Sequence, residues 1–247
     1  MTVLRTKEDT RRIREAGRIV KEVLALLKKR IREGVSTAEL DREAEDLIRA
    51  NEAEPAFKGY KGYPATICAS VNEVVVHGIP SGDIVLRTGD IIGVDVGVKK
   101  NGFFADAART FAVGRVDTAA RRLIEVTREC LEAGIAQAVE GNRVSDISNA
   151  IQMTAQKAGF KEVRKFVGHG IGRNLHEAPE VPNWGEKGKG PELKKGLLLA
   201  IEPMINMGTR DIDILDDGWT AVTRDGKLSA HFEETVIVGL KKAEIIT

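Results

Sequence analysis

Two of the chain's four histidines lie in one glycine-rich stretch, KFVGHGIGRNLHEAP, at residues 165–179. His169 stands among three glycines, and His176 follows seven positions later. Three kinds of segment have this composition: a phosphate-binding loop, a metal or catalytic site, and an ordinary loop. A phosphate-binding loop leads into the N-terminus of a helix, whose amides hold the anion. Repeated prolines and glycines follow here instead, so we reject the phosphate-binding loop.

Two aspartates lie in apolar segments on either side of a turn signal. Asp95 is in IIGVDVGV, Asp106 is in FFADAARTF, and the Asn101-Gly102 pair between them is typical of a two-residue β-hairpin turn. With that turn, position 95 faces position 108, so Asp95 and Asp106 share one face at roughly 5–8 Å between their Cβ atoms. Paired carboxylates in an apolar setting repel each other and lose hydration unless a cation lies between them. This pattern favours a metal site over an exposed charge at a strand edge.

Three further groups stand in similarly apolar surroundings. Glu202 ends the apolar run GLLLAI, Glu233 lies in HFEETVIVG, and His169 completes the set. Strand alternation would place Glu233 on one face with His231 and Thr235. Carboxylates together with one imidazole suit divalent ions such as Mn, Fe, Co or Zn. Two ions that share carboxylate bridges would activate a water for attack on a carbonyl or phosphoryl group.

The composition excludes several functional classes. Lys and Arg number 38 against 37 Asp and Glu, so the formal net charge of +1 gives no reason to expect nucleic-acid binding. No run approaches the length of a membrane span, and the charged start of the chain does not resemble a signal peptide. Cys68 and Cys130 are the only cysteines, too few for a secreted disulfide scaffold. We expect a cytoplasmic globular protein with no membrane partner and no direct nucleic-acid partner.

The elements that must position these residues follow from capping, periodicity and turn signals. Thr6 with Asp9 predicts the start of a helix that ends at Gly34, and Ser36 with Glu39 predicts the start of a second helix. Further expected elements are a strand at 65–71, helices at 117–140 and 144–158, and a strand-rich remainder with Asp217-Gly218 and Asp225-Gly226 turns. The order helix–helix–strands–helix–helix–strands is compatible with two similar halves around one sheet, in one domain spanning 1–247.

Taken together, these motifs resemble those of type I methionine aminopeptidases, metallopeptidases of the pita-bread fold. The matching stretches, which cover essentially the whole chain, are GYPATICASVNEVVVHGIP, GDIIGVDVGVKKNGFFADAARTF, VGHGIGRNLHEAPEVPNW, LLLAIEPMIN and DDGWTAVTRDGKLSAHFEETVIV. The resemblance implies an α/β (α+β) fold with pseudo-twofold halves and a curved central antiparallel β-sheet covered by helices. The first residues do not resemble an N-terminal zinc-binding or polybasic extension, so none is expected. Glu202 and Glu233 are 31 positions apart, too close for the helical insertion of type II enzymes, so the short bacterial form is expected.

The resemblance also implies a role for each metal-binding residue. Asp106 and Glu233 would bridge two divalent ions, Asp95 would bind one ion with both oxygens, and His169 and Glu202 would bind the other. The ligand types leave Co, Mn, Fe and Zn open. A bridging water acidified by the two ions would attack the first peptide carbonyl. Glu202 would act as the proton shuttle in addition to its role as a ligand.

Substrate contacts follow from the same resemblance. His176 would donate a hydrogen bond to the carbonyl oxygen as it becomes an oxyanion, and His77 would contact the scissile amide. The residues that would line the apolar methionine pocket, through dispersion and sulfur–aromatic contacts, are Tyr60, Tyr63, Cys68 and Trp219. Leu175 stands where many relatives carry an aromatic residue, and Phe57 where some carry cysteine. The family motif does not require His231, so we expect it to support a neighbouring ligand structurally.

The expected function is metal-dependent removal of the N-terminal methionine from nascent polypeptides whose second residue is small. The expected partners are these N-terminal Met residues and, transiently, the ribosome, and the chain is expected to act as a monomer. One alternative is a proline-directed aminopeptidase of the same fold, which usually carries an additional N-terminal domain. The other is a non-catalytic peptide- or RNA-binding relative, which should lack some ligand residues. The first aspartate at position 95, the complete ligand set and the near-zero net charge favour the methionine enzyme.

Overall fold

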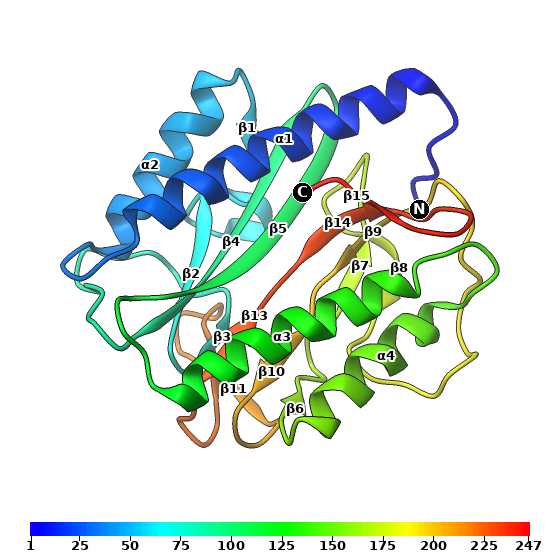
Figure 1. The fold of residues 1–247 in the computed structure, drawn as a ribbon. Helices are drawn as coiled ribbons and strands as arrows, with labels where there is room; N and C mark the ends of the chain where they lie inside the picture. The colour runs from blue at the N-terminus through cyan, green and yellow to red at the C-terminus, as the bar shows by residue number, and fades with distance from the viewer.

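The computed structural model describes residues 1–247, and its helices lie over antiparallel strands (Figure 1). The helices are α1 (Lys7–Arg30), α2 (Thr37–Ala50), α3 (Thr118–Ala136) and α4 (Val144–Lys157), with a 3-10 turn at Tyr60–Gly62. The strands of the first half are β1 (Glu54–Pro55), β2 (Ile67–Val71), β3 (Val74–Val76), β4 (Ile91–Lys100) and β5 (Phe103–Ala112). Those of the second half are β6 (Lys161–Glu162), β7 (Gly168–Gly170), β8 (Glu177–Val181), β9 (Leu198–Ile201), β10 (Met204–Asn206), β11 (Ile212–Ile214), β12 (Ala221–Thr223), β13 (Ser229–His231), β14 (Glu234–Ile237) and β15 (Glu244–Ile245).

The first two helices begin where their caps predict. The Thr6 hydroxyl accepts a hydrogen bond from the Asp9 amide at 3.0 Å, and Ser36 forms a reciprocal capping box with Glu39. The expected end of α1 at Gly34 is wrong. The helix stops at Arg30 because the next residue is extended, and Gly34 lies in the turn toward α2 with a φ of 84°.

The helices of the second half differ from expectation at one end. The helix predicted at 117–140 ends at Ala136. Val139 instead forms a β-bridge with Gly239, and the Glu140 amide donates to the Gly239 carbonyl, so this segment joins the strands. The helix predicted at 144–158 matches α4 within one residue.

The predicted hairpin of β4 and β5 has the expected register. Lys100 pairs with Phe103 and Asp95 pairs with Ala108 across the Asn101-Gly102 turn. Asp106 lies opposite Gly97, two positions from Asp95, so the two aspartates are diagonal neighbours on one face as predicted. β2 pairs with the other side of β4 and places Cys68 opposite Asp95.

In the second half, a five-stranded antiparallel sheet has the order β15-β14-β9-β7-β8. The single strand expected through HFEETVIVG is wrong, because it breaks between His231, which ends β13, and Glu234, which begins β14. At the break the Phe232 amide donates to the Pro203 carbonyl and the Glu233 amide donates to the Ala108 carbonyl at 2.9 Å. This interruption ties the second half to β5 of the first half.

Each half has a hydrophobic core beneath its own pair of helices. Figure 1 shows α1 running across the β4–β5 hairpin, and α3 and α4 lying over the strands of the second half. Ile13, Leu27 and Phe103 belong to the first core, and Leu123 and Ile147 to the second. The helices contain no apolar stretch that would span a lipid bilayer. The two-halved α/β architecture with antiparallel strands agrees with the predicted fold class.

Candidate metal centre and substrate cleft

One cavity of about 290 Å³ brings together every residue that the sequence analysis selected for metal binding, catalysis or substrate binding. These residues are Asp95, Asp106, His169, Glu202 and Glu233, together with Tyr60, Tyr63, Cys68, His77, His176 and Trp219. They come from both halves of the fold. The cavity therefore lies where the hairpin of the first half meets the strands of the second.

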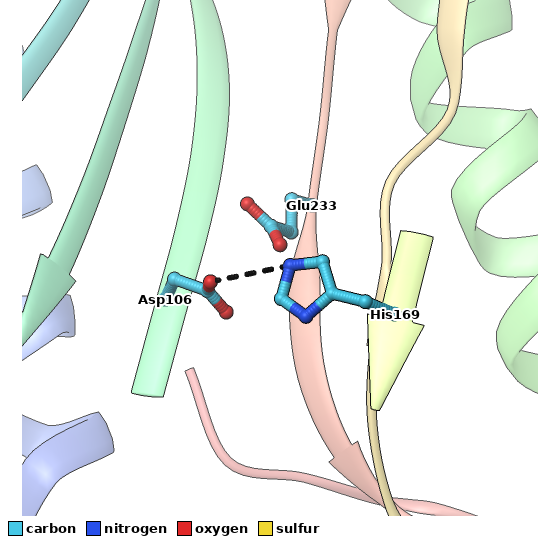
Figure 2. Close-up of side chains that lie close together, drawn as sticks. All are labelled: Asp106, His169 and Glu233. Carbon is cyan, nitrogen blue, oxygen red and sulfur yellow. Dashed lines mark ion pairs between the residues drawn. The ribbon is translucent and has the colours of Figure 1, made fainter. Parts of the chain in front are cut away.

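Three buried side chains form the centre of the cavity, and Figure 2 shows them converging from three separate segments. Asp106 projects from β5, His169 from β7, and Glu233 from the break before β14. One potential ligand atom from each lies within 4.8 Å of those of the other two. His169 Nε2 is 3.7 Å from Asp106 Oδ2 and 3.6 Å from Glu202 Oε1. The segments supply one nitrogen and several oxygens, close enough together for a single bound cation to contact them.

Hydrogen bonds orient these ligand atoms. The His169 Nδ1 atom is 2.9 Å from the carbonyl oxygen of Gly170, which only accepts, so the proton of the neutral ring is on Nδ1. The Nε2 lone pair then faces Asp106 and Glu202, as in metal-binding histidines. The Thr235 hydroxyl lies 3.0 Å from Asp106 Oδ1 and accepts from the Asp106 amide at 3.1 Å. Both contacts hold the side chains in position before any cation binds.

The carboxylates of the cavity are crowded and incompletely hydrogen-bonded. Asp95 Oδ1 and Glu233 Oε1 are buried and have no hydrogen-bond partner. Burial and the neighbouring carboxylates raise the pKa of Asp95, Glu202 and Glu233 well above the ordinary range. Burial raises the pKa of Asp106 to about 6. A divalent cation would neutralise these charges and would bind the oxygens that have no hydrogen-bond partner, so the residues fit a metal site.

The glycines around His169 serve backbone packing. β7 lies between β8 and β9, and a Cβ atom at Gly170 would overlap the carbonyl oxygen of Ala178. A Cβ atom at Gly168 would lie 2.5 Å from the Ala200 carbonyl oxygen. No helix follows β7, which agrees with our rejection of the phosphate-binding loop.

His176 and His77 flank the carboxylates as neutral imidazoles. His176 Nδ1 is 2.9 Å from the Tyr60 hydroxyl, and the two rings are stacked with centroids 5.1 Å apart. His77 has a φ of 60°, a left-handed conformation that is uncommon outside glycine and is concentrated at functional sites. Burial lowers the pKa of each histidine to about 4. Both rings can therefore donate a hydrogen bond at neutral pH without carrying a charge.

Aromatic residues and a thiol form the apolar wall of the cavity. The Tyr63 and Trp219 rings meet edge to face with centroids 5.1 Å apart. The Tyr63 hydroxyl lies 3.0 Å from the Ile67 carbonyl oxygen, which keeps its ring against β2. Cys68 is buried in the same group of side chains. This wall would accept a flexible apolar side chain, and sulfur favours such aromatic surroundings.

Comparison with known proteins places this arrangement in a family. The model of metallopeptidase family M24 matches residues 11–239. The chain belongs to metallopeptidase family M24. The protein is therefore a metal-dependent hydrolase, and its buried ligand cluster agrees with that chemistry.

Individual relatives of this metallopeptidase match over its whole length. The methionine aminopeptidase of Clostridium perfringens is 51% identical and the alignment covers 100% of this chain and 99% of that protein. The methionine aminopeptidase 1 of Bacillus subtilis is 48% identical with the same coverage of 100% and 99%. The crystal structure of the methionine aminopeptidase from Thermotoga maritima superposes with a TM-score of 0.98 at 42% identity, covering 100% of this chain and 99% of that one. The resemblance to type I methionine aminopeptidases and the pita-bread fold are confirmed.

The metallopeptidase cavity also contains residues that the sequence analysis did not select. They are Lys61, Val76, Lys165, Phe166 and Val167. Their only sequence signal is adjacency, since Lys61 follows Tyr60, Val76 precedes His77, and residues 165–167 come just before Gly168 and His169. Phe57 and Leu175, noted as departures from relatives, lie in the cavity wall.

His231 lies nearer to the predicted metal ligands than we expected of a residue that only supports a neighbouring ligand. It lines the cavity, and its buried Nε2 atom is 3.5 Å from Glu202 Oε2 without a hydrogen-bond partner. Burial lowers the pKa of His231 to about 3. A neutral imidazole in this place can steer the Glu202 carboxylate.

The metal-free metallopeptidase should lose stability as pH rises from about 6.5 to 8. Folded Asp95, Glu202 and Glu233 have raised pKa values, so they keep protons that the unfolded chain has already released. Each such group lowers the free energy of unfolding by about 1.4 kcal/mol per pH unit until its folded pKa is passed. The buried histidines, with pKa values lowered from 6.5, oppose this loss only slightly, because the unfolded chain releases most of their remaining protons within about one unit above pH 6.5.

Urea unfolding across this pH range, with chelator or with saturating Mn²⁺, measures the effect. The stabilisation by metal should grow with pH because metal binding displaces the protons. Glu233→Gln should flatten the pH dependence of the metal-free protein. A metal-free protein equally stable at both ends of the range would contradict the raised carboxyl pKa values.

Proposed function

We propose that this metallopeptidase removes the N-terminal methionine from polypeptides whose second residue is small, with two divalent ions held in the cavity. The observation that carries the proposal is the meeting of a carboxylate-rich ligand cluster and two neutral histidines with an apolar, aromatic wall in one cavity. The cluster suits hydrolysis, and the wall suits a thioether side chain. Full-length relatives named methionine aminopeptidase support the same substrate.

The five predicted ligands divide between two ions. Asp106 and Glu233 would contribute to holding both ions, Asp95 would help to hold one, and His169 with Glu202 would help to hold the other. The 3.7 Å and 3.6 Å separations of His169 Nε2 from Asp106 and Glu202 support this division. The ions would supply an acidified water and polarise the substrate carbonyl. The donor set admits Co, Mn, Fe or Zn.

The chain's own residues bind and orient the peptide and move the proton. The methionine side chain packs against Tyr63, Cys68 and Trp219. The Tyr60 hydroxyl donates a hydrogen bond to His176 Nδ1, so the proton of the neutral ring is on Nε2. The Nε2 proton then forms a hydrogen bond to the substrate carbonyl oxygen as negative charge develops on it.

Glu202 is the residue that transfers the proton, and His77 is the residue that contacts the scissile amide. Glu202 Oε1 lies 3.6 Å from His169 Nε2 at the ligand cluster, where the carboxylate would take a proton from the attacking water and deliver it to the leaving nitrogen. His231 Nε2 lies 3.5 Å from the Glu202 carboxylate, on the cavity wall beside it. His77 contacts the scissile amide from the Phe166 and Trp219 side of the cavity.

Action as a monomer stays a prediction from the sequence. Transient contact with the ribosome and a cytoplasmic location stay predictions from the sequence.

Hydrolysis of two tripeptides by metal-stripped protein tests the proposal. Met-Ala-Ser and Ala-Pro-Ser are incubated with the protein resupplied with one divalent ion at a time, while calorimetry counts bound ions. Release of free methionine only with metal, and binding of two equivalents, is the expected result. Cleavage of the proline peptide instead would establish the proline-directed alternative, and a folded protein without turnover would establish the non-catalytic one.

A further inference from the structure

Two lysines stand at the edge of the cavity, and no feature of the proposed chemistry uses them. Lys61 and Lys165 are the only Lys or Arg residues that line it. Both side chains are exposed, and neither lies within 4 Å of a carboxylate or makes a hydrogen bond. Many exposed lysines elsewhere in the fold are also unpaired, Lys58 with Glu45 at 2.7 Å being an exception, so what distinguishes Lys61 and Lys165 is their place at the cavity. Two unpaired ammonium groups beside one opening can therefore accept an external anion.

Each lysine stands beside one of the two histidines. Lys61 lies in the 3-10 turn next to Tyr60, with Nζ 5.4 Å from the Tyr60 ring, and Tyr60 stacks on His176. Burial mainly, and the Lys61 charge in smaller part, lower the pKa of His176 to about 4. Lys165 precedes Phe166, whose ring centroid is 5.0 Å from that of His77. Each lysine is thus adjacent in the chain to an aromatic residue that packs against one of the two histidines, His176 or His77.

The charges of the cavity are separated by depth. Asp106 and Glu233 are buried within it and Asp95 is half-buried, with its Oδ1 atom buried, whereas the two lysines are exposed. With methionine against the apolar wall and the scissile bond between His77 and His176, the chain beyond the second residue must leave toward solvent. It leaves past the lysines, because they and His176 are the exposed residues of the lining.

We propose that Lys61 and Lys165 form a cationic rim that selects polypeptides with an acidic residue at the third or fourth position. This inference rests on the proposed function and names a substrate class within it. An exposed ion pair changes an equilibrium by a factor of about 1.5 to 5. Attraction of an acidic residue and repulsion of a basic one at two lysines give a preference of about tenfold.

Steady-state hydrolysis of three amidated tetrapeptides by the metal-loaded enzyme tests the rim. Met-Ala-Glu-Gly, Met-Ala-Gln-Gly and Met-Ala-Lys-Gly share the scissile bond and differ only in the charge of the third residue. In the wild type, kcat/KM should be about tenfold higher for the Glu peptide than for the Lys peptide at low salt. The ratio should approach one in high salt, because screening removes interactions between exposed charges.

Charge reversal separates selectivity from general electrostatics. Lys61→Glu combined with Lys165→Glu should invert the preference, whereas Lys187→Glu combined with Lys241→Glu, the same charge change outside the cavity, should keep it. Equal rates for the three peptides in the wild type would overturn the rim. An equal loss of rate for all three peptides in the rim variant would also overturn the rim. It would show that the lysines affect the charge around the metals and do not select among substrates. Failure to cleave even the neutral Gln peptide would instead reject the proposed function itself.

Discussion

Asp106→Asn is expected to abolish methionine release and to prevent binding of two divalent ions. Asp106 is 2% exposed, lies 3.7 Å from His169 Nε2 and is fixed by the Thr235 hydroxyl at 3.0 Å. The amide keeps the size of the side chain but removes the charge proposed to be shared by both ions. A metal centre contributes several kcal/mol of transition-state stabilisation, so hydrolysis of Met-Ala-Ser should fall about 10³-fold or more.

The same substitution should stabilise the protein when metal is withheld. The pKa of Asp106 is about 6, so this carboxyl is the buried group that is charged at neutral pH, and the amide removes a desolvation cost on the order of 1 kcal/mol. Calorimetric metal titration, peptide hydrolysis and urea unfolding in chelator measure the three effects. Asp83→Asn, which removes an exposed aspartate outside the cavity, serves as the matched control. Two bound ions and normal turnover in Asp106→Asn would contradict the bridging role.

His176→Ala is expected to lower kcat for Met-Ala-Ser about 10²–10³-fold, the usual effect of removing one donor to a developing oxyanion. KM should change little, because the hydrogen bond strengthens only as the carbonyl oxygen becomes charged. His176→Gln should recover part of the rate, since its side-chain amide can still donate. Metal stoichiometry should stay the same in both variants, because His176 is not among the proposed ligands.

The Tyr60 hydroxyl provides an independent check on the orientation of His176. Tyr60→Phe keeps the stacked ring and removes the group 2.9 Å from His176 Nδ1, so kcat should fall less than in His176→Ala. A loss of bound metal in His176→Ala would reassign that histidine as a ligand. A rate unchanged by His176→Ala would remove it from the reaction.

Local features of the fold were predictable from the sequence because they depend on neighbouring residues. The Asn101-Gly102 turn determines which residues of β4 and β5 pair, and alternation then places Asp95 and Asp106 on one face. The start of α2 was predictable for the same reason, since Ser36 and Glu39 cap each other three positions apart. Where distant segments intervened, as at the break before Glu234, the local pattern gave the wrong element.

By itself, the sequence determined the family and selected the residues proposed to carry the chemistry, because residue types, order and local register follow directly from the chain. Only the tertiary structure decided how those residues meet. The Glu233 amide bonds to Ala108 across the two halves, Thr235 holds Asp106, and Tyr60 orients His176. The rim formed by Lys61 and Lys165 likewise exists only once both segments reach one cavity. These contacts join residues more than 100 positions apart. The packing of the two halves therefore determines them, and no local periodicity in the sequence encodes that packing.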